Sequence, residues 1–314
     1  MDAILYQPQT ALRLHYPTEF DKRQPVGENP PAGAIINYFL KTAAKDEVTL
    51  DILDAQGKLV RHLSSKEKKE NYQPPEWPDQ VETPRTIPAA EGMNRFAWDL
   101  HYDDPIQTPG AFYYGEGPRG PLALPGDFQV KLTVTGKSQT APLHLAIDPR
   151  IKDAEAALPK QFDLSSKVVS RIGELHQAIN EIRDVKTQIQ SVRKRFGAEE
   201  RLKPALTAAD ELAKKMSAVE EQLIQVNMKG TEGNLAFPNM LNEAFYSFSL
   251  TIQAADYGPT QPQYELFKML SERLDEQLKK WAQLKSDEIP KIATLIQQME
   301  LPAISVDGKS GAGK

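Results

Sequence analysis

The sequence predicts a chain of two parts, an antiparallel immunoglobulin/fibronectin III-like β-sandwich followed by an elongated antiparallel four-helix bundle. Up to residue 150, apolar residues recur at every second position over short runs, which is the period of a strand with one buried face. Beyond residue 150 they recur every three or four positions over long runs, which is the period of an amphipathic helix. The 314 residues are enough for two domains with separate cores.

The clearest strand pattern lies in residues 124–150. Apolar and polar residues alternate over 128–134, the chain turns at 136–138, and the alternation resumes over 143–147. This pattern predicts a hairpin with one buried face. It closes the β-rich part of the chain, and we expect its buried face to pack with Trp98.

The earlier strands are shorter and are separated by turns and two long loops. Runs at 34–42, 48–53, 58–63 and 92–100 have strand patterns, and Asp54-Ala55-Gln56-Gly57 provides the turn chemistry of a hairpin. No helix is predicted between them, which favours an antiparallel sandwich. The predicted sandwich spans residues 34–150, and the proline-rich segment 1–33 before it is predicted to be a linker.

Four helices are predicted within 151–302. The first is a single helix of roughly 35 to 40 residues with an almost regular heptad seam, a pattern typical of coiled coils, and Gly197 ends it. The second begins with Thr207 as its N-cap, and the third covers 240–254. The fourth opens at Thr260-Gln261-Pro262-Gln263, a capping-box pattern, and Pro290 is expected to kink or interrupt it. Residues 303–314 are predicted to be a flexible tail.

Composition and motifs exclude several classes of function. The chain has no cysteine and only five dispersed histidines, so no catalytic constellation and no metal or cofactor site is predicted. Its net charge is −5, which argues against nucleic acid as a partner. No apolar run approaches the roughly 20 residues of a membrane span. The ending GKSGAGK lacks the strand and helix that a phosphate-binding loop requires.

Four aromatic residues in the predicted loops are the candidate binding residues: Phe112, Tyr113, Tyr114 and Trp77. Exposed aromatic rings stack on sugars or on a partner protein. The same rings also serve as packing area that covers the open end of a sandwich. The sequence leaves both interpretations open.

Several segments together resemble a known family. GENPPAGAIINYFLK, VTLDILDAQGKLVRHL, GMNRFAWDLHY, the hairpin at 124–150 and GPTQPQYELFKMLSERLDEQL are similar to the C-terminal region of large bacterial sortilin-like, BNR-repeat β-propeller proteins. Those proteins are often labelled glycosyl hydrolases or exo-sialidases. The resemblance implies an extracytoplasmic location and an N-terminal β-propeller, or another protein, as partner. No Asp-box motif occurs in this chain, so no catalytic residue is carried over, and no signal peptide is visible.

The leading hypothesis is therefore a non-enzymatic accessory or protein-interaction region attached C-terminally to a propeller protein. The first alternative is a carbohydrate-binding module that uses the four aromatic residues. The second alternative is a hydrolase with a site between the two domains. The identity of the partner or ligand and the oligomeric state are left open.

Overall fold

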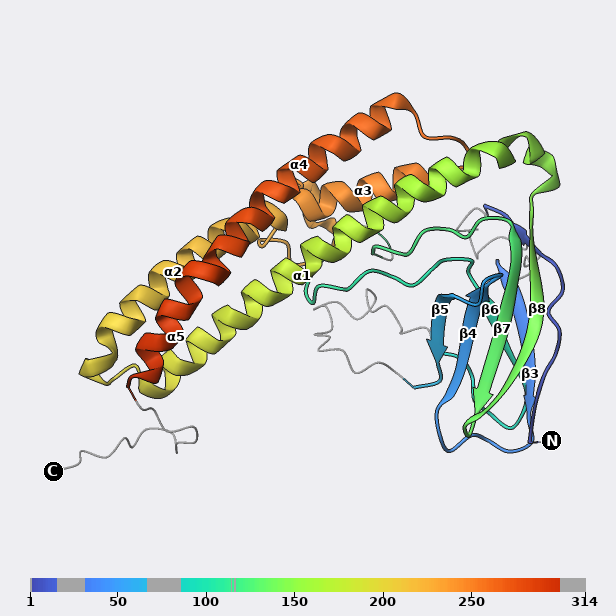
Figure 1. Ribbon diagram of the computed structural model, residues 1–314, viewed down its shortest axis with the longest axis horizontal. Helices are drawn as coiled ribbons and strands as arrows, with labels where there is room; N and C mark the ends of the chain where they lie inside the picture. The colour runs from blue at the N-terminus through green and yellow to red at the C-terminus, as the bar shows by residue number, and fades with distance from the viewer. Residues whose placement is uncertain (1, 16–31, 67–85, 114, 116, 300–314) are drawn as a thin grey trace. The chain divides into compact units, whose positions relative to one another are not determined.

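The computed structural model describes residues 2–15, 32–66, 86–113, 115 and 117–299. Figure 1 shows the strands and helices along the chain. The strands are β1 (Ala3–Leu5), β2 (Ala11–Arg13), β3 (Ala34–Leu40), β4 (Val48–Asp54), β5 (Leu59–Ser64), β6 (Gly92–Trp98), β7 (Gly126–Val134) and β8 (Lys137–Ile147). The longer helices are α1 (Leu158–Phe196), α2 (Lys203–Leu223), α3 (Leu241–Gln253), α4 (Gln261–Gln283) and α5 (Ile289–Gln297).

The chain divides into two compact units whose boundary does not follow the change from strands to helices. The first unit comprises Met1–Pro105, Glu116–Ser170 and Phe248–Tyr264. The second comprises Ile106–Gly115, Arg171–Ser247 and Glu265–Lys314. Helices α1, α3 and α4 therefore contribute residues to both units.

Two sheets form the β-part of the first unit. One has three antiparallel strands in the order β1-β3-β6, and the other has five strands in the order β2-β8-β7-β4-β5. The larger sheet is mixed because β2 runs parallel to β8, with Ala11 opposite Leu145. It curls into a half-barrel.

Alternation along the strands places the core of this unit. Every second residue of β3 is buried, and β4, β7 and β8 follow the same period over most of their length. Trp98 is 1% exposed, and its ring meets the ring of Phe128 edge-on at a centroid distance of 5.5 Å. The predicted contact between Trp98 and the hairpin is thus confirmed.

The predicted hairpins are also confirmed. β7 pairs with β8 in antiparallel register from Gly126–Leu145 to Val134–Lys137. In the β4–β5 turn, Asp54 Oδ1 accepts hydrogen bonds from the backbone N–H groups of Gln56 (3.0 Å) and Lys58 (2.8 Å). Gly57 adopts a φ of 79°, a left-handed conformation that glycine takes without steric cost.

The predicted immunoglobulin/fibronectin III-like sandwich is wrong. The five-stranded sheet is mixed and curled, whereas the prediction required antiparallel strands throughout. The difference comes from residues 1–33, which the sequence predicts to be a linker. In the structure, β1 joins the three-stranded sheet and β2 joins the larger one. Strands of three residues are too short to show a period of two, so the pattern missed them.

Long helices form most of the second unit. α1 is one continuous helix of 39 residues, as predicted, and Gly197 follows its end. α2 packs beside α5, and Figure 1 shows α5 continuing the course of α4. Between them lies a π-helical turn, Leu284–Glu288, that ends just before Pro290. The predicted interruption at Pro290 is confirmed, because a proline ring cannot fit an undisturbed helix interior.

The predicted four-helix bundle with coiled-coil character is also wrong. Parts of α1 and α3 belong to the same compact unit as the sheets, so the helices are not a separate bundle. The buried face of α1 is wider than a heptad seam, since Leu175, His176, Ala178 and Ile179 are all buried. Helical periodicity reveals an apolar face but not the partner that covers it.

Helix boundaries show one further difference. α2 begins at Lys203 with Pro204 in its first turn, and Thr207 lies inside the helix instead of capping it. The cap of α4 follows the prediction, because the backbone N–H of Thr260 donates to Gln263 Oε1 at 2.8 Å. The predicted tail at 303–314 lies outside the described residues. None of the described helices is both long and apolar enough to cross a membrane.

Candidate functional site

The predicted aromatic residues are placed only in part by the structure. Tyr114 and Trp77 lie outside the described residues, and Phe112 is half-buried. The hydroxyl of Tyr113 donates to Asn242 Oδ1 at 2.9 Å and lies 3.1 Å from His176 Nε2. The Tyr113 ring packs at a tilt against Tyr246, with centroids 4.7 Å apart. The structure therefore brings Tyr113 together with helix residues of the second unit, in an arrangement typical of packing.

The loop that carries Tyr113 is fixed by side chains from one face of α1. His176 Nδ1 bonds to the carbonyl of Ile106, and Asn180 Nδ2 donates to the carbonyl of Gln107 at 2.9 Å. Arg183 Nη1 donates to the carbonyl of Pro109 at 2.6 Å. Positions 176, 180 and 183 share a helix face, so one side of α1 satisfies three carbonyls of this loop.

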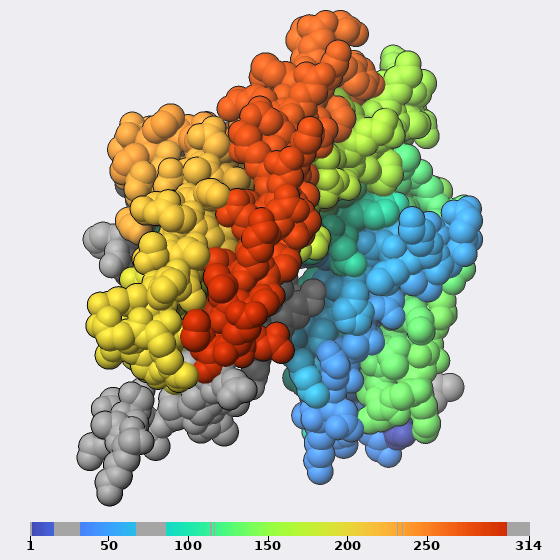
Figure 2. All heavy atoms as spheres, turned by 60° about the vertical axis from the view of Figure 1, so that its left-hand side comes forward, coloured from blue at the N-terminus to red at the C-terminus, as the bar shows by residue number. Residues whose placement is uncertain are grey.

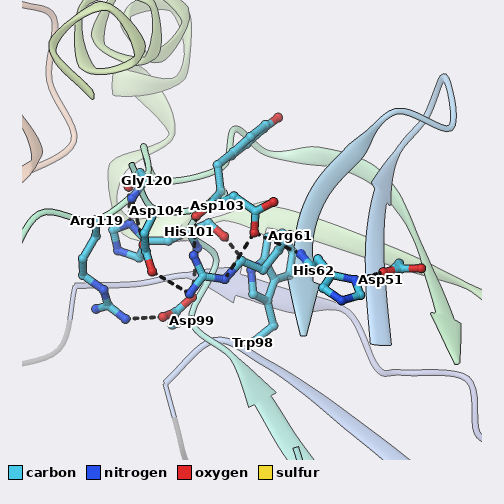
Figure 3. Close-up of polar contacts among 11 residues, drawn as sticks. Asp51, Arg61, His62, Trp98, Asp99, His101, Asp103, Asp104, Arg119 and Gly120 are labelled. Carbon is cyan, nitrogen blue, oxygen red and sulfur yellow. Dashed lines mark hydrogen bonds and ion pairs between the residues drawn. The ribbon is translucent and has the colours of Figure 1, made fainter. Parts of the chain in front are cut away.

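A second polar assembly belongs to the first unit and is shown in Figure 3. We call it the Arg61 cluster, after the β5 residue around which its carboxylates gather. Arg61 donates from Nη1 to the carbonyl of Tyr102 at 2.8 Å and from Nη2 to Asp104 Oδ2 at 2.9 Å. The other members of the Arg61 cluster are Asp99, His101, Asp103, Arg119 and Gly120.

Each carboxylate of the Arg61 cluster has partners inside the unit. Asp103 Oδ1 accepts the backbone N–H of His62 at 3.0 Å, and Asp104 Oδ1 accepts that of Gly120 at 3.1 Å. Arg119 forms an ion pair with Asp99. Burial would raise the pKa of the Asp104 carboxyl, but the hydrogen bond and charge of Arg61 outweigh burial and hold this pKa below its ordinary value.

Contacts at His101 and Gly120 stabilise the conformation of this loop. His101 Nδ1 donates to the carbonyl of Gly120 at 2.6 Å, and burial lowers the pKa of His101 although this hydrogen bond opposes the shift. A Cβ atom at Gly120 would lie 2.2 Å from the carbonyl oxygen of Tyr102, so only glycine fits. Leu100 adopts a φ of 66°, a strained conformation for leucine. The polar groups of the Arg61 cluster bond to each other and to the backbone of this turn, which they stabilise.

Two histidine–aspartate pairs lie on the surface of the larger sheet. His62 Nδ1 is 2.6 Å from Asp51 Oδ1 across β4 and β5, and His144 Nδ1 is 2.7 Å from Asp127 Oδ1 across β7 and β8. Each pair joins directly opposite positions of neighbouring strands. The repetition of one arrangement at two places is typical of cross-strand pairing and does not mark a single catalytic dyad.

A buried ion pair in the first unit was not predicted. Arg13 is 2% exposed and donates to Asp256 Oδ1 from Nε (3.0 Å) and Nη2 (2.8 Å). Its other contacts are the carbonyl of Ala123 (2.6 Å) and Gln161 Oε1 (3.2 Å). Burial would raise the pKa of Asp256, but hydrogen bonds from His15 and Arg13 hold it below its ordinary value. The only sequence signal is an arginine within the otherwise apolar run ALRL.

The described surface of the second unit contains a groove of about 860 Å³ bordered by α2, α4 and the π-helical turn. In Figure 2, α2 (yellow) and the red end of the helical chain, α4 with α5, lie next to each other on the face turned to the viewer. Ala218, Val219, Leu241 and Leu284 give the groove an apolar part. The remaining lining residues are glutamines and charged residues.

Most charges in the groove are paired with each other. Lys215 lies 2.6 Å from Glu288, and Lys280 lies 2.7 Å from Glu276. Arg273 forms no ion pair within the part of the chain that the structure describes. The sequence predicts that acidic residues such as Glu276 belong to solvated helix faces. The sequence does not predict the groove, because the periodicity of each helix does not show how the two helices pack against each other.

Gln277 is the buried polar residue of the groove. It is only 7% exposed, yet its amide makes no hydrogen bond to any described residue. The described buried side-chain atoms that lack a hydrogen-bond partner belong to other residues, so the amide atoms of Gln277 are in contact with solvent. Because Gln277 lines the groove, a hydrogen-bonding partner can reach its amide from there.

The described ranges contain no group of three or more histidine, aspartate and glutamate side chains that could hold a metal ion. The groove therefore differs from the Arg61 cluster and from the buried ion pair in one respect. It alone of these three features offers an unpartnered cation and an unpartnered amide to the outside. Comparison with protein-family models and with curated proteins finds no match to this chain.

Proposed function

We propose that this chain is a non-enzymatic accessory region that binds another protein, and that the groove between α2 and α4 is its binding surface. The observation that carries the proposal is Gln277, a residue 7% exposed whose amide lines the groove without a hydrogen-bond partner among the described residues. In the context suggested by the family resemblance, the chain is attached to an N-terminal β-propeller outside the cytoplasm.

The polar assemblies support a structural and not a catalytic role for the rest of the described surface. In the Arg61 cluster, Asp103 and Asp104 are bonded to backbone N–H groups and face Arg61. A catalytic carboxylate needs a free oxygen directed at substrate. The cross-strand histidine–aspartate pairs occur twice and are partly exposed, with side chains of His62 and His144 at 40% and 55% exposure.

The lining of the groove favours a peptide over a sugar. Binding sites for sugars commonly stack aromatic rings on the sugar face, and among the described residues that line the groove none is aromatic. Amide side chains and aliphatic residues side by side suit a polypeptide, which offers backbone amides and apolar side chains together. A volume of about 860 Å³ is large enough for several residues of an extended segment.

Peptide display tests the proposal on the full chain. Random linear peptides are selected on the immobilised protein, and the affinity of recovered peptides is measured by fluorescence polarisation. We expect saturable binding that is weakened by Gln277→Leu. A glycan array and an assay with aryl glycosides are run on the same preparation. Selective glycan binding, glycoside hydrolysis, or a failure to recover any saturable peptide would overturn the proposal.

A further inference from the structure

We infer that the groove between α2 and α4 recognises a peptide segment with a carboxylate next to an aliphatic residue, and that Arg273 binds this carboxylate. The inference rests on the proposed function and names the chemistry of the partner. It follows from three properties of the groove, namely its one cation without an ion pair among the described residues, the amide of Gln277 without a described hydrogen-bond partner, and its apolar part.

The one cation of the groove wall without an ion pair among the described residues, Arg273, points to an anionic ligand group. Two of the three cations on its wall are neutralised, Lys215 by Glu288 and Lys280 by Glu276. Arg273 has no such partner among the described residues. The wall carries three cations and three carboxylates, and Asp287 is the carboxylate without an ion pair among the described residues. Asp287 lies 14 positions after Arg273, roughly 20 Å away at 1.5 Å per residue, so the demand for a negative charge is local to Arg273. A guanidinium binds carboxylates through two parallel hydrogen bonds.

Gln277 supplies the second part of the recognition. It follows Arg273 by four positions on α4, so both side chains share one helix face and both line the groove. The amide of Gln277 offers donors and an acceptor, the same groups that a peptide backbone offers in return. A ligand whose carboxylate meets Arg273 therefore has its neighbouring backbone amide within the reach of Gln277.

The apolar part of the groove favours a peptide over a small free carboxylate as the ligand. Val219, Leu241 and Leu284 lie in the same hollow as Arg273 and Gln277. Burying one aliphatic side chain against them stabilises the complex through the hydrophobic effect. A small organic acid makes none of this contact. A segment with aspartate or glutamate beside leucine, isoleucine or valine satisfies all three properties.

The experiment uses peptides recovered on the full chain, together with matched charge variants. Arg273→Gln removes the proposed ligand of the carboxylate. Lys279→Gln removes the same charge from the same helix at an exposed position that does not line the groove. Each peptide is also synthesised with its acidic residue replaced by the amide, and dissociation constants are measured by fluorescence polarisation.

We expect recovered peptides to share an acidic residue beside an aliphatic one. Arg273→Gln and the amide version of the peptide should each weaken binding by about tenfold or more, because a charge-assisted hydrogen bond is being removed. Lys279→Gln should change the affinity less than about twofold. Since Arg273 is exposed, its replacement leaves the fold intact, which circular dichroism verifies.

Other results are distinguishable. If peptides bind with saturation but lack an acidic residue, or if Arg273→Gln and Lys279→Gln have equal effects, the inference is wrong while the protein-binding function stands. If acetate or glutarate competes as well as the peptide at equal concentration, the ligand is a small acid, which also contradicts the inference. If no peptide binds, both proposals fail.

Discussion

Arg273 and Gln277 lie one helical turn apart on α4 and line the same groove. Among the described residues, Arg273 has no ion-pair partner, and the solvent-accessible amide of the largely buried Gln277 has no hydrogen-bond partner. A free cation on a surface costs little, because water solvates it. The amide of Gln277 also reaches solvent, so replacing it should cost little stability but remove a group that a ligand can bond. Gln277 therefore yields a prediction that separates a binding role from a structural one.

Gln277→Leu should leave stability nearly unchanged but weaken binding. The leucine has a similar size, and the amide that it removes has no described protein partner, so the free energy of unfolding should change by less than about 1 kcal/mol. Affinity for a selected peptide should fall at the same time. Urea denaturation and fluorescence polarisation on the same preparation measure both quantities. A purely structural Gln277 would give a loss of stability instead.

The buried pair of Arg13 and Asp256 should be among the most sensitive sites of the first unit. Their side chains are 3% and 0% exposed, so Arg13→Met leaves a buried carboxylate with only His15 as a described ion-pair partner. We expect a loss of about 3 to 5 kcal/mol in the free energy of unfolding. Lys167→Met is the control, because Lys167 and Asp163 are both 57% exposed and their pair contributes less than about 1 kcal/mol. Equal losses for the two variants in urea denaturation would refute the assignment.

His101 should make the stability of the first unit depend on pH. Burial lowers the pKa of His101 in the folded state, whereas the unfolded chain protonates near its ordinary value of about 6.5. The folded state therefore binds fewer protons, and stability should fall as pH drops below about 6.5. His101→Gln should flatten the change in unfolding free energy between about pH 7.5 and 5.5. His144→Gln, at an exposed site, serves as the control. An unchanged slope in His101→Gln would count against a neutral buried His101.

Tyr113→Phe tests whether Tyr113 supports packing or binds glycans. The substitution keeps the ring against Tyr246 but removes the hydroxyl that bonds to Asn242. We expect a loss of about 1 kcal/mol in thermal or chemical denaturation, the usual cost of one hydrogen bond. A ring that stacks on sugar would tolerate the same change with little loss of stability and would show binding on a glycan array.

Sequence reasoning located local structure well and tertiary structure poorly. The hairpin at 124–150, the 39-residue helix α1 and the interruption at Pro290 follow from alternation, helical periodicity and proline geometry, which act within short stretches. The parallel pairing of β2 with β8 joins positions more than a hundred residues apart. The three residues of β2 do not indicate this pairing. The predicted antiparallel sandwich was therefore wrong.

The candidate site shows the same limit. Aromatic residues in predicted loops suggest a binding site, but the structure shows that Tyr113 contacts His176 and Asn242, which lie on two different helices. The sequence pattern singles out neither Arg273 nor Gln277. Their environment depends on α2, the start of α3 and the π-helical turn, and only the packed structure shows that Gln277 is buried.

The most direct test of the protein-binding groove is a double-mutant cycle between Arg273 and the acidic residue of a selected peptide. Dissociation constants are measured for the wild-type pair, for Arg273→Gln, for the peptide with its acid changed to the amide, and for both changes together. We predict a coupling free energy of at least about 1 kcal/mol, because either single change already removes the shared interaction. Additive effects of the two changes would contradict a contact between Arg273 and the carboxylate.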